Sequence, residues 1–172
     1  KEVIQACTQA CENQIVTAVN FNSPGQVVIA GHKDAVDRAM LIAKSLGAKR
    51  TLLLPVSVPS HCELMLSAAE ALRELLSEIE FFPPHIPVIS NVDVHTESDP
   101  ALIRAALTRQ LYQPVRWVEI ITHMRAQNID LILECGPGTV LTGLNKRIDK
   151  NIKGISMGTA HAINEALAIV RE

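Results

Sequence analysis

Several features that would assign a function immediately are absent from this sequence. The 16 Lys and Arg residues and 18 Asp and Glu residues are interspersed along the 172-residue chain, for a formal net charge of -2. Because no basic run can follow a phosphate backbone, nucleic acid is not an expected partner. No apolar run is long enough to cross a bilayer, and the polar first residues, KEVIQACTQACENQ, do not resemble a secretory signal. We therefore expect a globular cytoplasmic protein with no nucleic-acid or membrane partner.

The sequence also lacks paired cysteine motifs. Its four cysteines are Cys7, Cys11, Cys62 and Cys135, and they include no CxxC pair. This usage indicates reduced, buried and unreactive thiols rather than a disulfide framework. Cys7 and Cys11 share a helical face, but the further Cys or His ligands that a zinc site needs are not nearby. No metal or cofactor is expected.

A serine nucleophile motif is missing as well. The serine of acyl-transferring α/β enzymes usually stands in G-x-S-x-G, and no serine of this chain has that context. The segment Gly136-Pro137-Gly138, between a predicted strand and a predicted helix, can present N–H groups to an anion. The P-loop lysine and the dinucleotide fingerprint are both absent, so a structural turn is the favoured interpretation.

The first third of the chain has the pattern of a small lobe. The predicted elements are a helix over 1–12, strands over 14–21 and 26–30, a helix over 33–46 and a strand over 51–58. Pro24 and Gly25 suit the central positions of a type II turn. This order is the ferredoxin-like pattern without its first strand, and the chain starts with Lys rather than Met. We expect an incomplete small subdomain over 1–57 and a chain that is part of a longer product.

The remainder, over 58–172, alternates helices with strands. The predicted elements are a helix over 62–80, a strand over 87–94, helices over 100–113 and 117–127, a strand over 130–135, and helices over 139–148 and 160–171. Alternation of this kind is typical of a parallel α/β sheet that is covered on both faces.

The segment PVSVPSHCELM contains the strongest catalytic candidate, His61. It follows an apolar strand, where ligands and catalytic groups of open α/β sheets collect. Ser60-x-x-Glu63 fits a capping box, which makes Ser60 the expected N-cap and places His61 at the first helical position. There the helix dipole favours a neutral ring, as a general base requires. Taken alone, however, the spacing favours an ordinary surface or capping histidine. Pairing with the adjacent Cys62 is not expected, because neighbouring side chains diverge.

A general base also needs an acceptor for its second ring nitrogen, and Pro114 indicates one. In a helix that stays regular to its end, the carbonyl of Gln110 would point at residue 114, which has no N–H to donate. The Gln110 carbonyl is therefore free to accept a hydrogen bond from elsewhere, or from water, as at most helix ends.

Five segments of the chain together resemble one enzyme family. They are, in collinear order, VNFNSPGQVVIAGH, LPVSVPSHCELM, SNVDV, RQLYQPVRW and ECGPGTVLTGLNKRI. They closely resemble the bacterial malonyl-CoA:acyl carrier protein transacylases of type II fatty acid synthesis. The resemblance runs through essentially the whole chain, which makes it more specific than any single motif. It implies an α/β-hydrolase-like core, of which this chain is the C-terminal part, with a ferredoxin-like small subdomain inserted.

The resemblance implies a reaction and its participants. Malonyl would pass from malonyl-CoA, through a malonyl-serine intermediate, to the phosphopantetheine thiol of acyl carrier protein in a serine–histidine ping-pong transfer. These two substrates and the N-terminal part of the same enzyme are the implied partners. The implied enzyme needs no cofactor and is monomeric when intact.

The family's functional residues match positions of this chain only in part. Its catalytic histidine falls on His61, and the glutamine whose backbone carbonyl orients that histidine falls on Gln110. Asn22 resembles an asparagine near the mouth of the cleft, although Asn20 and Asn22 also flank the hairpin turn and suit a capping role. The nucleophile motif Gly-His-Ser-Leu-Gly and the malonate-binding arginine have no counterpart here, and neither Arg109 nor Arg116 matches the latter. We therefore expect this segment alone to be inactive.

Two other functions remain open from the sequence. One is a non-catalytic module of the same fold that binds carrier protein without turnover. The other is half of a hydrolase, with water as the acyl acceptor.

Overall fold

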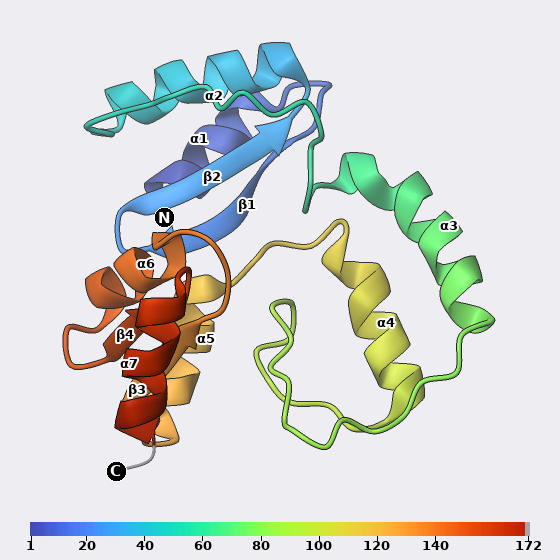
Figure 1. The fold of residues 1–172 in the computed structure, drawn as a ribbon. Helices are drawn as coiled ribbons and strands as arrows, with labels where there is room; N and C mark the ends of the chain where they lie inside the picture. Colours follow the sequence, from blue (N-terminus) through green and yellow to red (C-terminus); the bar gives the residue numbers. More distant parts are fainter. Residues whose placement is uncertain (171–172) are drawn as a thin grey trace. The chain divides into compact units, whose positions relative to one another are not determined.

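The computed structural model describes residues 1–170 and has an α/β fold (Figure 1). The described chain forms two compact units. The first comprises Lys1–Phe21 and Gln26–Arg116, and the second comprises Asn22–Gly25 and the residues from Trp117 onward. None of the helices within residues 1–170 is both long and apolar enough to cross a membrane. The division into a small subdomain over 1–57 and a core part over 58–172 stays a prediction.

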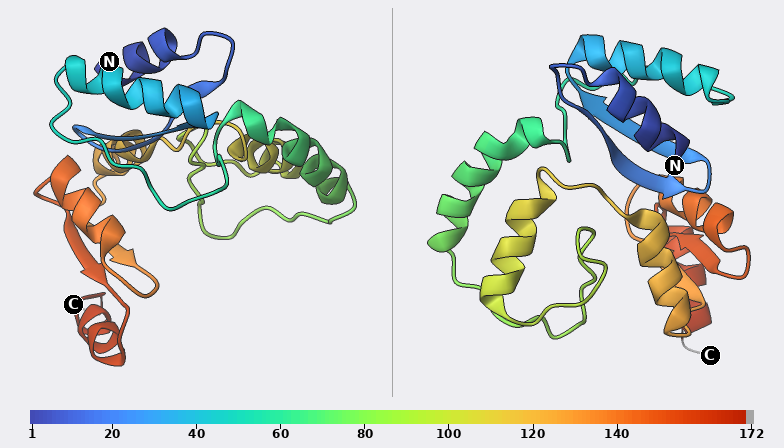
Figure 2. Two further views of the ribbon diagram at one scale, coloured as in Figure 1. Left: turned by 90° about the horizontal axis from the view of Figure 1, so that it is seen from above. Right: turned by 180° about the vertical axis from the view of Figure 1, so that it is seen from behind.

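In the first unit, two helices form one layer, and the strands of a β-hairpin form a second layer beneath them. Helices α1 (Glu2–Ala10) and α2 (Lys33–Ser45) lie on one face of strands β1 (Val16–Ser23) and β2 (Gln26–Gly31), as Figure 2 shows. Small side chains allow this close packing, and the buried core residues are Cys7, Ala10, Val16, Ala35 and Ala39. The predicted hairpin is present, and Gly25 has φ 78°, as the second central position of a type II turn requires.

The end of β2 passes unusually close to the residue before β1. A Cβ atom on Gly31 would lie 2.1 Å from the Ile15 carbonyl oxygen and 2.6 Å from the Val16 Cα atom. His32 follows at the N-cap of α2, where its backbone N–H donates to the Ile15 carbonyl at 2.8 Å. The Ile15 N–H in turn lies 3.0 Å from His32 Nδ1. Residue 31 is therefore a position that only glycine fits.

The strand predicted over 51–58 is wrong, because these residues have no strand structure. Among residues 1–170, β1 and β2 form a two-stranded sheet, and a further bridge joins Asn20 of β1 to Val115. No strand therefore supplies partners for the backbone groups of this segment, residues 51–58. Its apolar side chains are exposed, with Leu52 61% and Val56 68% accessible. The segment is a connection without regular secondary structure.

The strand predicted over 87–94 is also wrong. The chain reverses here, since the Ser90 N–H donates to the His95 carbonyl and the Val94 N–H donates to the Ser90 carbonyl, each at 3.0 Å. Val94 has φ 60°, which is incompatible with a strand. A single antiparallel bridge between Ile89 and Thr96 is the β-structure that remains.

Helices α3 (Leu66–Ser77) and α4 (Pro100–Gln110) pack against each other and lie side by side in Figures 1 and 2. The helix predicted from residue 62 starts with a short 3-10 turn, η1 (Glu63–Met65), and ends at Ser77. The start of α4 follows its sequence signals, because Asp99 caps the Ala101 and Leu102 N–H groups and Pro100 occupies the first turn.

The second unit is built around two parallel strands. Its elements are α5 (Trp117–Ala126), β3 (Leu131–Glu134), α6 (Val140–Ile148), β4 (Lys153–Ser156) and α7 (Ala160–Val170). Strand β3 pairs with β4 in register from Leu131 opposite Lys153 to Glu134 opposite Ser156. The buried Asn145 of α6 accepts a hydrogen bond from Trp117 Nε1 at 3.0 Å and so ties α5 to α6. The sequence prediction missed β4, and Arg171 of the predicted last helix lies outside the described residues.

Glu134 connects the end of β3 to the start of α6. Its carboxylate accepts from the Leu141 N–H at 3.0 Å, the Thr142 N–H at 2.8 Å and the Thr142 hydroxyl at 2.7 Å. The Thr142 hydroxyl is the largest cause that lowers the pKa of Glu134 below its ordinary value of 4.5, followed by the backbone N–H groups. A carboxylate here also complements the positive end of the helix dipole.

We predict that Gly31→Ala destabilises the protein by about 3 kcal/mol, because the new methyl group collides with backbone atoms that cannot move aside. Gly25→Ala is the control, since its Cβ has open space and the left-handed φ costs only about 1 kcal/mol. Urea unfolding measures both variants. Equal losses for the two would show that the close approach at Gly31 is not maintained in solution.

We predict that Glu134→Gln lowers the melting temperature at neutral pH. The lowered pKa means that the stabilisation is fully present above pH 4.5 and is lost as the pH falls through the folded-state value. The difference between wild type and variant should therefore shrink on acidification. A difference that is independent of pH would contradict the capping role.

Candidate active site

His61 lies just before η1 and not on a helix. The N-cap of η1 is Cys62, and α3 begins only at Leu66. The prediction that Ser60 caps a helix starting at His61 is therefore wrong. The physical reason is the left-handed backbone of His61, with φ 63°, which interrupts any helical run at this residue. The helix-dipole argument for a neutral ring no longer applies.

The ring of His61 instead lies against the C-terminus of α4. His61 Nδ1 is 2.7 Å from the backbone carbonyl oxygen of Gln110. Because a carbonyl oxygen can only accept, Nδ1 carries the hydrogen of this bond. A neutral ring in this tautomer has its lone pair on Nε2, the arrangement that a general base needs. The catalytic roles of His61 and Gln110 themselves stay predictions.

The reason that the Gln110 carbonyl is free lies four residues further along the chain. The last regular hydrogen bond of this helix end runs from the Gln113 N–H to the Arg109 carbonyl at 2.9 Å. The next donor in the series would be residue 114, and a proline there has no N–H. The Gln110 carbonyl thus has no partner within its own helix.

The chain after α4 is attached to the edge of β1. Val115 donates its N–H to the Val19 carbonyl and accepts from the Phe21 N–H, both at 2.9 Å. These bonds form a parallel bridge between Asn20 and Val115. Through this bridge, the hairpin fixes the position of the α4 C-terminus.

The two arginines near the site have structural partners. Arg109, on the last turn of α4, forms an ion pair with Asp93, and Arg116 donates from Nη1 to the Val92 carbonyl at 3.0 Å. Both therefore hold the reversed segment around residues 90–95. Sequence reasoning missed this contact, since nothing in the spacing of Asp93 and Arg109 indicates it.

The cysteine thiols divide into buried and accessible groups. Cys7 and Cys62 are buried; burial raises the pKa of both thiols, that of Cys7 to about 11 with a further contribution from Cys11. Cys11 is half-buried and Cys135 is exposed, so the expectation that all four are buried is wrong. Within residues 1–170, His, Cys, Asp and Glu side chains form no group that could hold a metal ion.

Asn22 lies in β1, one residue before the buried Ser23, and its own side chain is partly exposed. Its role at a cleft mouth stays a prediction. The Gly136-Pro137-Gly138 segment forms the turn between β3 and α6. The Glu134 carboxylate already takes N–H groups at the start of α6, so this helix end is not available to an external anion.

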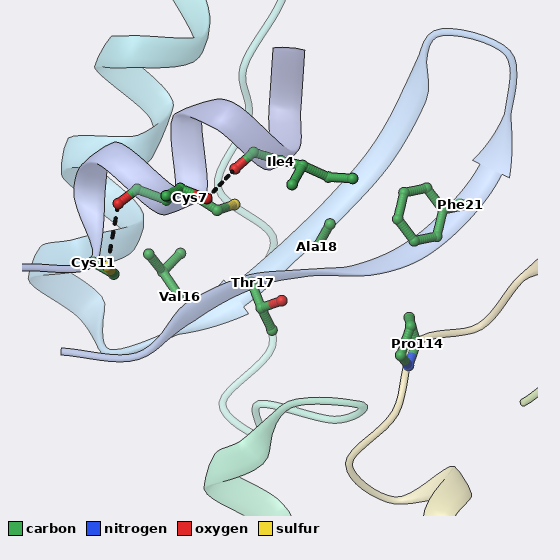
Figure 3. A pocket seen from close by; sticks show the side chains of 9 residues that line it. Ile4, Cys7, Cys11, Val16, Thr17, Ala18, Phe21 and Pro114 are labelled. Carbon is green, nitrogen blue, oxygen red and sulfur yellow. Dashed lines mark hydrogen bonds between the residues drawn. The ribbon is translucent and has the colours of Figure 1, made fainter. Parts of the chain in front are cut away.

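An apolar groove of about 400 Å³ lies between α1 and β1 (Figure 3). Its lining includes Ile4, Cys7, Val16, Ala18, Phe21 and Pro114. Neither His61 nor Gln110 lines it. The titratable side chains that line the groove are the thiols of Cys7 and Cys11.

Comparison with known proteins gives consistent matches. The family model described as acyl transferase domain matches residues 2–160. The malonyl CoA-acyl carrier protein transacylase of Salmonella typhimurium is 53% identical over 167 residues, which are 97% of this chain and 52% of that protein. The Bacillus subtilis protein of the same name is 39% identical over 172 residues, 100% of this chain and 54% of its own length. This chain thus spans about half the length of the curated relatives it matches.

Solved structures agree with these sequence matches. An acyl carrier protein S-malonyltransferase from Vibrio cholerae has a TM-score of 0.94 and 53% identity, over 96% of this chain and 54% of that chain. A malonyl-transacylase solved with its type II PKS acyl-carrier protein has a TM-score of 0.96 and 49% identity, over 98% and 54% of the two chains. With the family model matching nearly its whole length, this chain belongs to the acyl transferase domain family.

Proposed function

We propose that this chain is the C-terminal part of a malonyl-CoA:acyl carrier protein transacylase and supplies the catalytic histidine. The observation that carries the proposal is the His61 ring, held at 2.7 Å by the Gln110 carbonyl so that Nε2 is left as the basic nitrogen. Its fold would be the C-terminal part of an α/β-hydrolase-like core with an incomplete ferredoxin-like subdomain. Similarity to transacylases over 97% of the chain supports this reaction in preference to others.

The proposed reaction has two half-reactions that use the same base. In the first, His61 Nε2 takes the proton of a serine hydroxyl from the N-terminal part as the oxygen attacks the malonyl thioester. The carbon–sulfur bond breaks, and His61 returns the proton to the leaving coenzyme A thiolate. In the second, His61 deprotonates the phosphopantetheine thiol, whose sulfur attacks the malonyl-serine ester. The carbon–oxygen bond of the ester breaks, and His61 returns the proton to the serine oxygen. The Gln110 carbonyl stabilises the protonated ring in both steps.

The remaining features of the proposal follow the relatives. Malonyl-CoA and acyl carrier protein are the substrates, and one solved relative is a complex with an acyl-carrier protein. Asn22 would contact substrate near the cleft. The intact enzyme would work as a cytoplasmic monomer, without a cofactor, and this segment alone would be inactive because it lacks the nucleophile.

We predict that His61→Ala in the full-length enzyme lowers malonyl transfer by about 10²–10⁴-fold, the usual contribution of a positioned general base. The assay incubates enzyme with malonyl-CoA, with and without carrier protein, so that transfer, hydrolysis and binding without turnover are separated. His85→Ala, at an exposed position outside the site, is the matched control. Activity of His61→Ala within tenfold of wild type would refute the assignment.

We predict that Gln110→Ala is mild and that Pro114→Ala is worse. The role of Gln110 belongs to its backbone carbonyl, which alanine keeps, whereas alanine at 114 provides an N–H that competes with His61 for that carbonyl. Steady-state kcat reports both, and Pro83→Ala, at an exposed proline, is the control. If Gln110→Ala were as damaging as His61→Ala, the side chain and not the carbonyl would be responsible.

A further inference from the structure

We propose that the backbone carbonyl of Leu111 is a second positioning group for His61. It binds the main chain of the histidine, whereas the Gln110 carbonyl binds its ring. The His61 N–H donates to the Leu111 carbonyl at 2.9 Å, next to the carbonyl that binds the ring. The inference rests on the proposed function, because it concerns how the same histidine is aimed.

The backbone of His61 lies in the left-handed region. Its φ of 63° is disfavoured for a residue with a Cβ atom, and such a conformation persists only where surrounding contacts impose it. The Leu111 bond fixes the amide plane before Cα, and the Gln110 bond fixes the ring beyond Cβ. Two anchors on one rigid helix end therefore determine both where Cα lies and where the ring points.

The residue after His61 holds the backbone from the other side. Cys62 is fully buried, with 0% of its surface accessible, and its carbonyl accepts from the Met65 N–H at 2.9 Å. A change of the His61 torsion angles would have to pull Cys62 out of its packing or break the Leu111 bond. The strain is thus retained locally instead of relaxing along the chain.

The availability of the Leu111 carbonyl has a cause different from that of Gln110. In a continuing helix the Val115 N–H would donate to Leu111. Here Val115 donates to the Val19 carbonyl of β1 instead, at 2.9 Å. The missing N–H of Pro114 therefore leaves the Gln110 carbonyl free, and the bridge from Val115 to β1 leaves the carbonyl of the C-cap residue Leu111 free. This gives Val19 of the hairpin, which precedes His61 by 42 residues, a role in aiming that histidine.

The test removes only the donor, by replacing the amide before residue 61 with an ester through incorporation of the α-hydroxy analogue of histidine into the full-length enzyme. We expect kcat for malonyl transfer to fall at least about tenfold, since small misplacements of a catalytic group are costly, with KM for malonyl-CoA within about twofold. In nitrogen-15 spectra of the ring, the proton should move partly from Nδ1 to Nε2.

The matched control is the same ester exchange at Val94. This residue also has a positive φ of 60° and donates its N–H to a carbonyl, that of Ser90 at 3.0 Å. It should lose comparable stability while keeping kcat and the ring spectrum. Wild-type kcat in the residue-61 ester, or equal losses of kcat in both esters, would overturn the proposal.

The ring spectrum separates this inference from the proposed function, because it needs no turnover. If the wild-type enzyme did not transfer malonyl but the ester at residue 61 still changed the ring tautomer, the proposed reaction would be refuted and the positioning role of Leu111 would be kept.

If the ester variant does not fold, the melting temperatures of two other variants test the same position. His61→Gly should melt at a higher temperature than His61→Ala, because glycine tolerates a left-handed backbone. Ser60, which lacks a positive φ, is the control: there the alanine variant should melt at a higher temperature than the glycine variant. An alanine variant at 61 as stable as the glycine variant would contradict the proposal.

Discussion

The hydrogen bond between His61 Nδ1 and the Gln110 carbonyl is the constraint on which the candidate site depends. It sets the tautomer of the ring and ties the segment just before η1 to the C-terminal end of α4. That end is fixed in turn by the Val115 bridge to β1. The ring is thus held by a backbone carbonyl 49 residues away in sequence, and the helix end that presents this carbonyl is held by backbone hydrogen bonds to β1.

Backbone contacts of this kind explain which parts of the site the sequence could predict. Pro114 is a local signal, because a missing N–H frees a carbonyl four residues earlier whatever the tertiary structure. The left-handed conformation of His61 has no such signal, since histidine is enriched in this region relative to most residues but still adopts it only in a small minority of cases. The capping-box pattern at Ser60 and Glu63 therefore gave a plausible but wrong local structure, and a tertiary bond to Leu111 replaced it.

The fold shows the same division between local and distant information. The hairpin at Pro24-Gly25 and the helix start at Asp99-Pro100 were predictable from turn and capping chemistry. The apolar run over 51–58 has a strand pattern but no strand beside it in the described residues, and pattern alone cannot reveal that. Strand β4 was missed because its four residues, Lys153–Ser156, are short and weakly apolar and owe their structure to pairing with β3.

In the proposed function, the base and the nucleophile of one reaction lie in two parts of a longer chain. The most direct test is mass spectrometry of the full-length protein after brief exposure to malonyl-CoA without carrier protein. We predict a malonyl ester on a serine that precedes this chain, its loss when acyl carrier protein is added, and no modification within residues 1–172. A malonyl adduct on a residue of this chain, or no adduct at all, would contradict the proposed function.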